Sequence, residues 1–354
     1  MLTSTTDLDS LCSALVYAYI RTTPTTLHIP LSNLPRSDLA LRTEMAAVLH
    51  SADLSPSQLL TLSDIPDDLP AEHTRWLLVD HNSLTGPLAR RFAFGGTIIG
   101  CIDHHEDERV VPSDVVPRII EPCGSCMSLI VEESRALWDK VAREQGREEE
   151  KRLAALGLAP VLIDTINLTE EHKVRPKDIS AAQFLETRLQ GGDGVFERTT
   201  FFDRISAVKE DISPLGFRDI IRKDYKEWTE GELKLGVTSV VKGLDYLAGK
   251  GSSPTEFLDA VEEWGKERDL DVMSVMTAEN GDAFRRNLLV WGRSQGGIKA
   301  LRAFEAASSE KLQLKTFGDG KFDDDSRKAW HQENLAASRK QVAPLLRDAL
   351  NQVP

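Results

Sequence analysis

Two apolar runs that each end in an aspartate constrain the fold of this chain most. Residues 75–79, with the sequence RWLLV, lead into Asp80-His81-Asn82, and residues 97–101, TIIGC, lead into Ile102-Asp103-His104-His105. Short apolar runs followed by polar residues are typical of buried parallel strands. Open α/β sheets bind ligands beyond the carboxyl ends of their strands. We therefore expect these polar clusters to meet at one edge of a sheet.

Predicted strands alternate with predicted helices over the first half of the chain. Further strand-like segments lie at residues 26–31 and 59–62, and helix-like segments lie at residues 39–54 and 87–92. Such alternation is typical of an α/β domain with a mainly parallel sheet flanked by helices. A long helix is predicted to begin at Gly124-Ser125-Cys126, where small residues favour either a bound anion or a plain helix cap.

The length of the chain predicts two domains, because 354 residues exceed what one hydrophobic core usually serves. The periodic pattern weakens after Gly191-Gly192-Asp193-Gly194, so we assign residues 1–198 and 199–354 to separate domains. The second domain is predicted to be a smaller α+β domain with a mixed sheet. Its strand candidates lie at residues 237–241, 271–276, 287–291 and 312–317.

Basic residues of the second domain occupy two separate segments. The apolar spacing predicts a helix over residues 217–228, on which Arg222 and Lys226 lie four apart and share a basic face. Arg339 and Lys340 begin another predicted helix, although positive charge is unfavourable at a helix N-terminus. The pair therefore indicates an anionic ligand, with a merely solvated pair as the alternative.

Acidic residues of the first domain also lie at the ends of predicted elements. Asp7 and Asp9 precede an apolar stripe with helical spacing, so both lie at a helix N-terminus. Capping of that helix accounts for one carboxylate, whereas metal ligation accounts for both. Asp164 lies within the apolar run of residues 153–166, where a carboxylate is costly unless it is paired or binds a metal.

Composition excludes several classes of protein. A net charge of −13 argues against broad nucleic-acid binding, which needs a positive surface. The sequence contains neither the apolar run of about 18–20 residues that spans a membrane nor a signal peptide. Cys123 and Cys126 form a single C-x-x-C, which supplies only half the ligands of a structural zinc site. Reduced thiols in a cytoplasmic protein are the better interpretation.

The polar residues at element ends form a candidate metal site. Carboxylates with a few imidazoles suit Mg²⁺ or Mn²⁺, and converging carboxylates repel one another unless cations compensate them. Two such ions could share an aspartate, activate water and polarise a phosphoryl group, while basic groups neutralise the phosphate oxygens. The candidate residues are Asp7, Asp9, Asp80, Asp103, His104, His105 and Asp164.

The ordered motifs resemble those of the DHH phosphoesterase superfamily. The segments that carry this resemblance in the first domain are Asp7-Leu8-Asp9-Ser10, Val79-Asp80-His81-Asn82, Asp103-His104-His105, Gly124-Ser125-Cys126 and Asp164. Residues 221–226, IRKDYK, and 338–342, SRKQV, resemble the second DHH-associated domain. That domain is shared by family II inorganic pyrophosphatases, prune-type proteins and fungal-type exopolyphosphatases. The chain is most similar to the cytosolic exopolyphosphatases in its RKDYK motif, in Asn82 and in its overall length.

The resemblance implies a role for each motif. Two divalent ions, Mg²⁺ or Mn²⁺, would be held by Asp7, Asp9, Asp80, His104 and Asp164, with Asp9 and Asp80 as bridges. His105 would contact the scissile phosphate and assist proton transfer, while Asp103 orients an imidazole. From the facing domain, phosphate oxygens would be held by Lys226, Arg339 and Lys340. The active site would lie in the interdomain cleft and be assembled by its closure.

The implied activity is removal of terminal phosphate from inorganic polyphosphate by a monomeric, cytoplasmic enzyme without nucleic-acid or membrane partners. One alternative is a prune-like hydrolase of short polyphosphates, nucleoside polyphosphates or cyclic nucleotides. Another is a catalytically impaired member that binds phosphate or a partner protein. Inorganic pyrophosphatase is disfavoured, because those enzymes usually have His where this chain has Asn82.

One departure from the family lies at the N-terminus. Family members carry an apolar strand before the Asp-x-Asp element, and the last residue of that strand contributes to one metal site. The corresponding residue here is Thr3, and no strand is predicted before it. We therefore expect the sheet to lack a strand near its centre, with lower metal affinity at that site and a less stable first domain.

Overall fold

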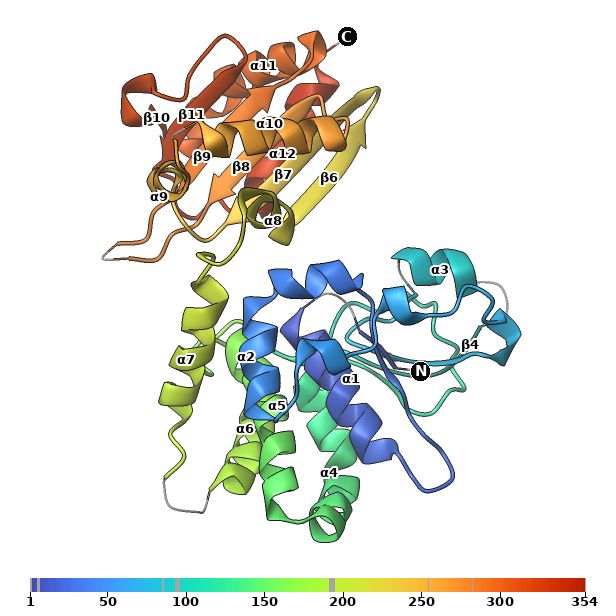
Figure 1. Cartoon of the computed structure of the whole chain (residues 1–354). Helices are drawn as coiled ribbons and strands as arrows, with labels where there is room; N and C mark the ends of the chain where they lie inside the picture. Colours follow the sequence, from blue (N-terminus) through green and yellow to red (C-terminus); the bar gives the residue numbers. More distant parts are fainter. Residues whose placement is uncertain are drawn as a thin grey trace. The chain divides into compact units, whose positions relative to one another are not determined.

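The chain divides into two compact units, Met1–Lys209 and Glu210–Pro354 (Figure 1). The computed structural model describes residues 2–4, 7–84, 86–92, 96–190, 195–253, 255–281 and 283–353. The division falls inside helix α7 (Arg198–Glu210), later in the chain than the predicted boundary between residues 198 and 199. The predicted linker, residues 191–194, lies outside the described residues. Within those residues, no helix is both long and apolar enough to cross a membrane.

The first unit is built on a parallel sheet with the strand order β2-β1-β3-β4-β5. Its strands are β1 (Leu2–Ser4), β2 (Pro30–Ser32), β3 (Arg75–Val79), β4 (Thr97–Asp103) and β5 (Arg118–Ile120). Besides α7, its helices are α1 (Leu8–Arg21), α2 (Thr43–Ser51), α3 (Gly86–Phe92), α4 (Cys126–Gln145), α5 (Arg147–Asp164) and α6 (Pro176–Leu189). The predicted α/β architecture with a mainly parallel sheet is confirmed.

Strand β1 corrects the expectation that the sheet lacks a central strand. Leu2 and Thr3 pair with Leu77 and Leu78 of β3 on one side and with Pro30 and Leu31 of β2 on the other. Three extended residues are enough to fill this gap, and they pair backbone groups that β2 and β3 would otherwise leave exposed. The side chain of Thr3 lies outside the described part, so its effect on metal binding stays a prediction.

Helices cover both faces of this sheet, because successive strand residues point to opposite sides. Leu77 and Val79 of β3 pack into one core with the apolar faces of α1, α4, α5 and α6, which lie together in Figure 1. Trp76 and Leu78 pack on the other face, against Leu88 and Phe92 of α3. With both faces buried, the strand reads as a continuous apolar run rather than an alternating one.

Local predictions outside these central strands were less accurate. The segment at residues 59–62 forms no strand, because Thr61 makes only an isolated bridge to Ser32 before a short 3-10 turn. The densely charged segment at residues 143–151 is almost entirely helical. Only Gly146, with φ of +89°, separates α4 from α5, in a conformation that side-chain-bearing residues rarely adopt.

The second unit contains a mixed sheet with the strand order β10-β11-β9-β8-β7-β6. Only β7 and β8 pair in parallel within this described sheet. The strands are β6 (Tyr225–Glu230), β7 (Leu233–Val240), β8 (Val272–Thr277), β9 (Asn287–Gly292), β10 (Leu314–Thr316) and β11 (Arg327–Gln332). The helices are α8 (Phe217–Lys223), α9 (Leu244–Lys250), α10 (Glu256–Glu267), α11 (Gln295–Leu312) and α12 (Arg339–Asn351). The predicted α+β architecture is confirmed.

The helix predicted over residues 217–228 is wrong beyond Lys223. Helix α8 ends there, and Tyr225 begins β6, which forms an antiparallel hairpin with β7. Glu230 faces Leu233 across a two-residue turn that begins at Gly231, with φ of +60°. A glycine of positive φ at this position is typical of tight hairpins. Arg222 and Lys226 therefore lie on different elements and share no helix face.

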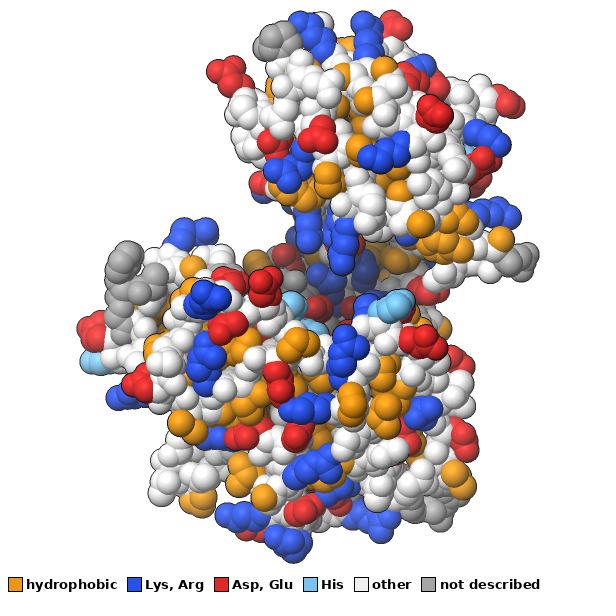
Figure 2. All heavy atoms as spheres, turned by 180° about the vertical axis from the view of Figure 1, so that it is seen from behind, with side chains coloured by type: hydrophobic (Ala, Val, Ile, Leu, Met, Phe, Trp, Pro, Cys, Tyr) orange, Lys and Arg blue, Asp and Glu red, His pale blue; other side chains and the backbone are white. Residues whose placement is uncertain are grey.

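Charged side chains of both signs are interspersed over the face of the molecule that Figure 2 shows. The chain contains 43 basic and 56 acidic residues, which give the net charge of −13. A mixed and net negative surface attracts an anion poorly over long distances. Recognition of an anionic ligand must therefore depend on local groups, which are described next.

Candidate metal centre

One cavity of about 360 Å³ in the first unit gathers the acidic and imidazole residues that the sequence analysis selected. Asp103 is buried behind it rather than lining it. Three further residues line the cavity, namely Cys123, Gly124 and Lys173. None of them was individually predicted as a site residue. The predicted residues in the lining are Asp7, Asp9, Asp80, His104, His105 and Asp164.

Different elements deliver these side chains to the same place. Asp80 directly follows β3 and His104 directly follows β4, so the carboxyl ends of two adjacent parallel strands supply them. Asp7 is the N-cap of α1 and Asp9 lies in its first turn, whereas Asp164 is the last residue of α5. Asp80 has φ of +64°, a left-handed conformation that is uncommon outside glycine and that often occurs at functional sites.

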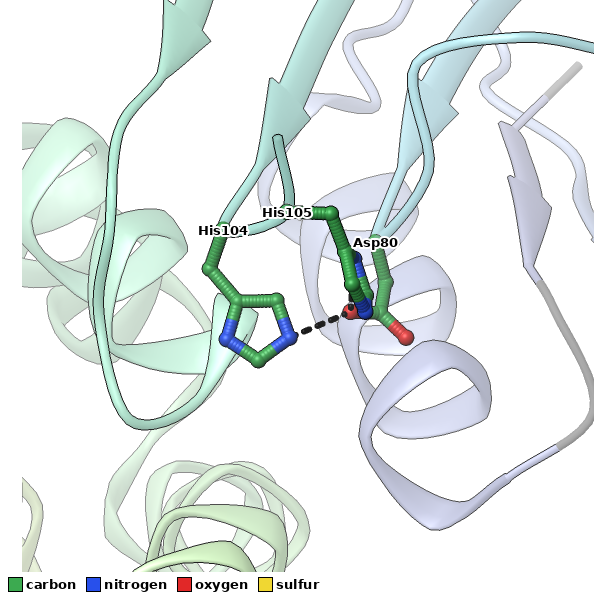
Figure 3. Close-up of side chains that lie close together, drawn as sticks. All are labelled: Asp80, His104 and His105. Atoms are coloured by element: carbon green, nitrogen blue, oxygen red, sulfur yellow. Dashed lines mark ion pairs between the residues drawn. The ribbon is translucent and has the colours of Figure 1, made fainter. Parts of the chain in front are cut away.

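Asp80, His104 and His105 form the tightest group in the cavity (Figure 3). One ligand atom from each residue lies within 4.8 Å of the others. His104 Nε2 lies 3.2 Å from Asp80 Oδ1, and His105 Nδ1 lies 3.8 Å from the same oxygen. This spacing would let a single cation contact the carboxylate and both imidazoles.

Both imidazoles are oriented by their other contacts. His104 Nδ1 lies 3.0 Å from the backbone oxygen of Cys123, which leaves Nε2 directed at Asp80. His105 Nδ1 lies 2.8 Å from Asp103 Oδ1, the orienting contact that was predicted for Asp103. Asn82 Nδ2 donates to Asp103 Oδ2 at 2.5 Å and to the backbone oxygen of Glu106. Asn82 therefore holds the loop that follows β4.

The N-terminus of α4 is occupied by two of the protein's own carboxylates. Asp9 Oδ2 accepts the backbone N–H of Cys126 at 2.6 Å, and Asp9 Oδ1 accepts that of Met127 at 3.1 Å. Asp178, fully buried, accepts the backbone N–H groups of Gly124 and Ser125 at 2.9 and 3.2 Å. Of the two predicted alternatives for this helix start, the structure therefore shows capping.

Sequence reasoning missed Asp178, whose partners are mostly backbone groups. Gly124 is the one local signal: a Cβ there would lie 2.7 Å from Asp178 Oδ2, so only glycine lets this carboxylate approach the loop. Ser10 was quoted only as part of a motif, yet it links two site residues. Its backbone N–H donates to Asp7 Oδ1 at 3.0 Å, and its hydroxyl contacts the carboxylates of both Asp7 and Asp80.

Burial and mutual repulsion make these carboxylates hold protons strongly. Burial and the charge of Asp80 raise the pKa of Asp9 to about 7. Burial and the charge of Asp9 raise the pKa of Asp164 well above its usual value. Although burial opposes it, the hydrogen bond to Asp80 and the charge of Asp9 raise the pKa of His104 to about 10. The cluster thus lacks positive charge, which protons supply in the absence of cations.

The donor set fits divalent metal ions. Asp164 Oδ2 is buried and accepts no hydrogen bond from a described side chain or amide, which is costly for a carboxylate without a cation. The cavity offers four carboxylates and two imidazoles, and hard cations such as Mg²⁺ and Mn²⁺ prefer oxygen-rich sites of this kind. Cations would compensate the repulsion between the carboxylates and release the bound protons.

Apart from His105, the predicted phosphate-binding residues lie in the second unit. Lys226 is exposed on β6, and Arg339 and Lys340 form the first turn of α12 after the N-cap Ser338. Arg339 donates to the backbone oxygen and to Oδ1 of Asp224, both at 2.8 Å. This contact brings the start of α12 to the residue that precedes β6. The two basic motifs therefore meet within this unit, although they are far apart in the sequence.

Fold and site together define an α/β protein with a carboxylate-rich cavity for divalent cations and a separate unit that carries exposed basic motifs. The chain belongs to the DHH family. The model for the "DHH family, N-terminal domain" matches residues 1–159, and the model for the "DHHA2 domain" matches residues 203–349. Both matches agree with the resemblance drawn from the motifs.

Several relatives match nearly the whole chain. A Schizosaccharomyces pombe protein named "Putative exopolyphosphatase" is 34% identical over 98% of this chain and 89% of its own length. The mouse protein "Exopolyphosphatase PRUNE1" is 25% identical over 98% of this chain and 73% of its own length. A Brevibacillus brevis protein named "Probable manganese-dependent inorganic pyrophosphatase" is 26% identical over 78% of this chain and 81% of its own length.

A solved structure supports the fold. The crystal structure of a Methanococcus jannaschii "putative family II inorganic pyrophosphatase" matches with a TM-score of 0.57 and 22% identity. The match covers 99% of this chain and 100% of that chain. At this level of identity, the likeness shows a shared architecture and does not indicate the substrate.

Proposed function

We propose that this chain is a metal-dependent exopolyphosphatase, a phosphoanhydride hydrolase that releases terminal orthophosphate from inorganic polyphosphate. Its relatives are named exopolyphosphatase and inorganic pyrophosphatase, and both names denote enzymes that cleave phosphoanhydride bonds. The observation that carries the proposal is the convergence of six predicted side chains, from segments far apart in the first unit, on one cavity. A structural role alone would not require so many carboxylates in one place.

In this proposal, Mg²⁺ or Mn²⁺ ions are held by Asp7, Asp9, Asp80, His104 and Asp164. Bound divalent ions lower the pKa of water and withdraw electrons from phosphoryl oxygens, which favours attack of water at phosphorus. Two ions would compensate the four carboxylates of the cavity, and we propose this number for that reason.

The protein's own groups bind the substrate and move protons. His105 Nδ1 faces Asp103, so its Nε2 is the ring atom that remains to face a phosphate. The hydrogen bond to Asp103 raises the pKa of His105, which favours the protonated form that can donate to a departing phosphate oxygen. Lys226, Arg339 and Lys340 bind phosphate oxygens and compensate the charge that develops on them. We propose that closure of the two domains brings these residues to the metal site.

A phosphate-release assay tests this function. Wild-type protein is incubated with long polyphosphate, tripolyphosphate and pyrophosphate, each with Mg²⁺ and with Mn²⁺. We expect turnover of polyphosphate, and its loss by several orders of magnitude in Asp80→Ala, because that carboxylate contacts both imidazoles. Asp68→Ala is the matched control, because Asp68 is exposed and is not among the residues that line the cavity.

The substrates distinguish the outcomes. Faster turnover of long chains than of tripolyphosphate supports the exopolyphosphatase, whereas a preference for tripolyphosphate supports a prune-like hydrolase of short chains. Metal-dependent release that survives Asp80→Ala would contradict the proposed site. Binding of polyphosphate without any release would indicate a member that binds phosphate without hydrolysing it.

A further inference from the structure

The loop between α5 and α6 carries a strained turn directly after the site residue Asp164. Ile166, Asn167 and Leu168 have φ values of +50°, +55° and +65°. Side-chain-bearing residues adopt this left-handed conformation mostly as single residues, and consecutive ones are costly. Strain of this kind persists where surrounding contacts enforce it, and it often occurs at functional sites.

Buried contacts hold the turn in place. The backbone N–H of Asn167 donates to the oxygen of Leu162 at 2.7 Å, and that of Leu168 donates to Thr165 Oγ1 at 3.1 Å. Thr165 is fully buried, and its backbone oxygen also accepts the N–H of Glu170 at 3.1 Å. The chain therefore reverses at the end of α5 and returns toward the cavity instead of leaving it.

This reversal makes Lys173 part of the cavity wall. Its backbone N–H donates to the oxygen of Glu170 at 2.9 Å, which closes the returning turn. Lys173 supplies the only lysine or arginine side chain in the described lining of the cavity, and it is exposed to solvent. A lysine in this position adds a positive charge beside a group of carboxylates and imidazoles.

Lys173 also differs from the next lysine along the chain. Lys177 forms ion pairs with Glu121 and Glu132 and thereby joins α6 to α4. Among the ion pairs between described residues, none involves Lys173. An exposed ammonium group that is not committed to a carboxylate remains available to a mobile anion.

The charge balance of a metal-loaded cavity favours such an anion. Four ionised carboxylates, from Asp7, Asp9, Asp80 and Asp164, carry four negative charges, and two divalent cations carry four positive charges. These charges cancel, so Lys173 would give the loaded cavity a positive excess. Phosphate binding at this lysine should therefore follow metal binding.

We propose that Lys173 binds the substrate directly, through non-bridging oxygens of a phosphate group next to the one being cleaved. The inference rests on the proposed function, and it adds a phosphate contact supplied by the first domain itself. Because Lys173 is exposed at the wall, it meets the part of the phosphate chain that lies outside the carboxylate cluster. The contact exists before and after bond cleavage, so it lowers KM more than it raises kcat.

The test compares wild type with Lys173→Met, Lys173→Arg and the control Lys140→Met, an exposed lysine on α4 outside the cavity. KM and kcat are measured with tripolyphosphate. Binding of imidodiphosphate, whose bridging N–H resists hydrolysis, is measured by calorimetry on manganese-loaded protein. We expect Lys173→Met to raise KM and the imidodiphosphate Kd about tenfold, as is typical for loss of a charge-assisted contact. Lys173→Arg should retain most of the affinity, and Lys140→Met should match wild type.

The inference is overturned if Lys173→Met matches Lys140→Met in both KM and Kd. It is also overturned if Lys173→Met changes only the melting temperature or the Mn²⁺ affinity, because Lys173 would then be a structural residue. If wild type releases no phosphate from any polyphosphate, the proposed function fails. The imidodiphosphate comparison still decides the role of Lys173 in that case, because it needs no turnover.

Discussion

The acidic cavity of the first unit and the basic motifs of the second unit differ in how firmly their side chains are held. Asp9, Asp80 and Asp103 are buried, and each has its oxygens fixed by amides, hydroxyls or imidazoles. Lys226 and Lys340 are exposed, and Arg339 is held by Asp224. In the proposed function, metal binding would use this prearranged geometry, whereas phosphate binding would depend on charges that adjust to the substrate.

The largest effect is expected from a variant that weakens the support of the cavity wall without removing a proposed metal ligand. Asp178→Asn weakens the contacts that hold the Cys123–Ser125 loop, whose Cys123 oxygen orients His104. We expect Mn²⁺ affinity, measured by calorimetry, to fall by about 10- to 100-fold, as is typical when a ligand loses its orienting partner. Asp139→Asn, which removes an exposed charge from α4, is the control. Equal Mn²⁺ affinity in both variants would show that the cavity does not depend on this support.

A smaller effect is expected from a single change on the basic side. Lys226→Met removes one exposed cation from β6, so we expect KM for polyphosphate to rise about tenfold while Mn²⁺ affinity stays constant. Lys315→Met, a similarly exposed lysine paired with Glu333, should leave KM unchanged. A fall in Mn²⁺ affinity in Lys226→Met would mean that the two sites are not separable.

The smallest expected effect is on thermal stability, and it depends on pH. Between pH 3.8 and about 7, folded Asp9 holds a proton that the unfolded chain has lost, so stability falls as pH rises through this window. The raised pKa of His104 acts in the same direction, because its contribution is complete below pH 6.5 and is lost toward about 10. In a chelator, the melting temperature should therefore fall from pH 5 to pH 8.

Manganese should reverse this trend, because cations replace the protons. At a free Mn²⁺ concentration of about 100 times the Kd at pH 8, the expected stabilisation at that pH is about 2.7 kcal/mol. The same concentration should stabilise the protein less at pH 5, where protons compete with the cations. Differential scanning fluorimetry at both pH values, with and without Mn²⁺, measures the four melting temperatures. A manganese effect that is larger at pH 5 would contradict the pKa shifts assigned to this cluster.

The sequence predicted those parts of the site whose side chains follow central strands or begin helices. Val79-Asp80 and Asp103-His104 were identifiable because β3 and the carboxyl-terminal half of β4 are buried on both faces, which makes their ends clear in the sequence. Asp178 was not identifiable, because its role lies in accepting backbone N–H groups from a loop far away in the chain. Lys173 was missed because a left-handed turn of ordinary residues has no compositional signal.

Two errors in the fold have similar physical causes. Tyr225 and Trp228 fit helical spacing, but pairing with β7 outweighed that local preference, and Gly231 was the available signal of the hairpin. Strand β1 was missed because three residues give no periodicity to read. It is a strand because its backbone pairs with residues 30–32 and 77–78, which are distant in the sequence.

The carboxylates that cap α4 accept hydrogen bonds from backbone amides that could otherwise bind an anion. A bare helix N-terminus would attract chloride, sulfate or any other abundant anion, since its macrodipole carries partial positive charge. Here the amides already donate hydrogen bonds to Asp9 and Asp178, so they are not available to an incoming anion. If the cavity binds cations as proposed, phosphate would bind there through those cations and not through this helix N-terminus.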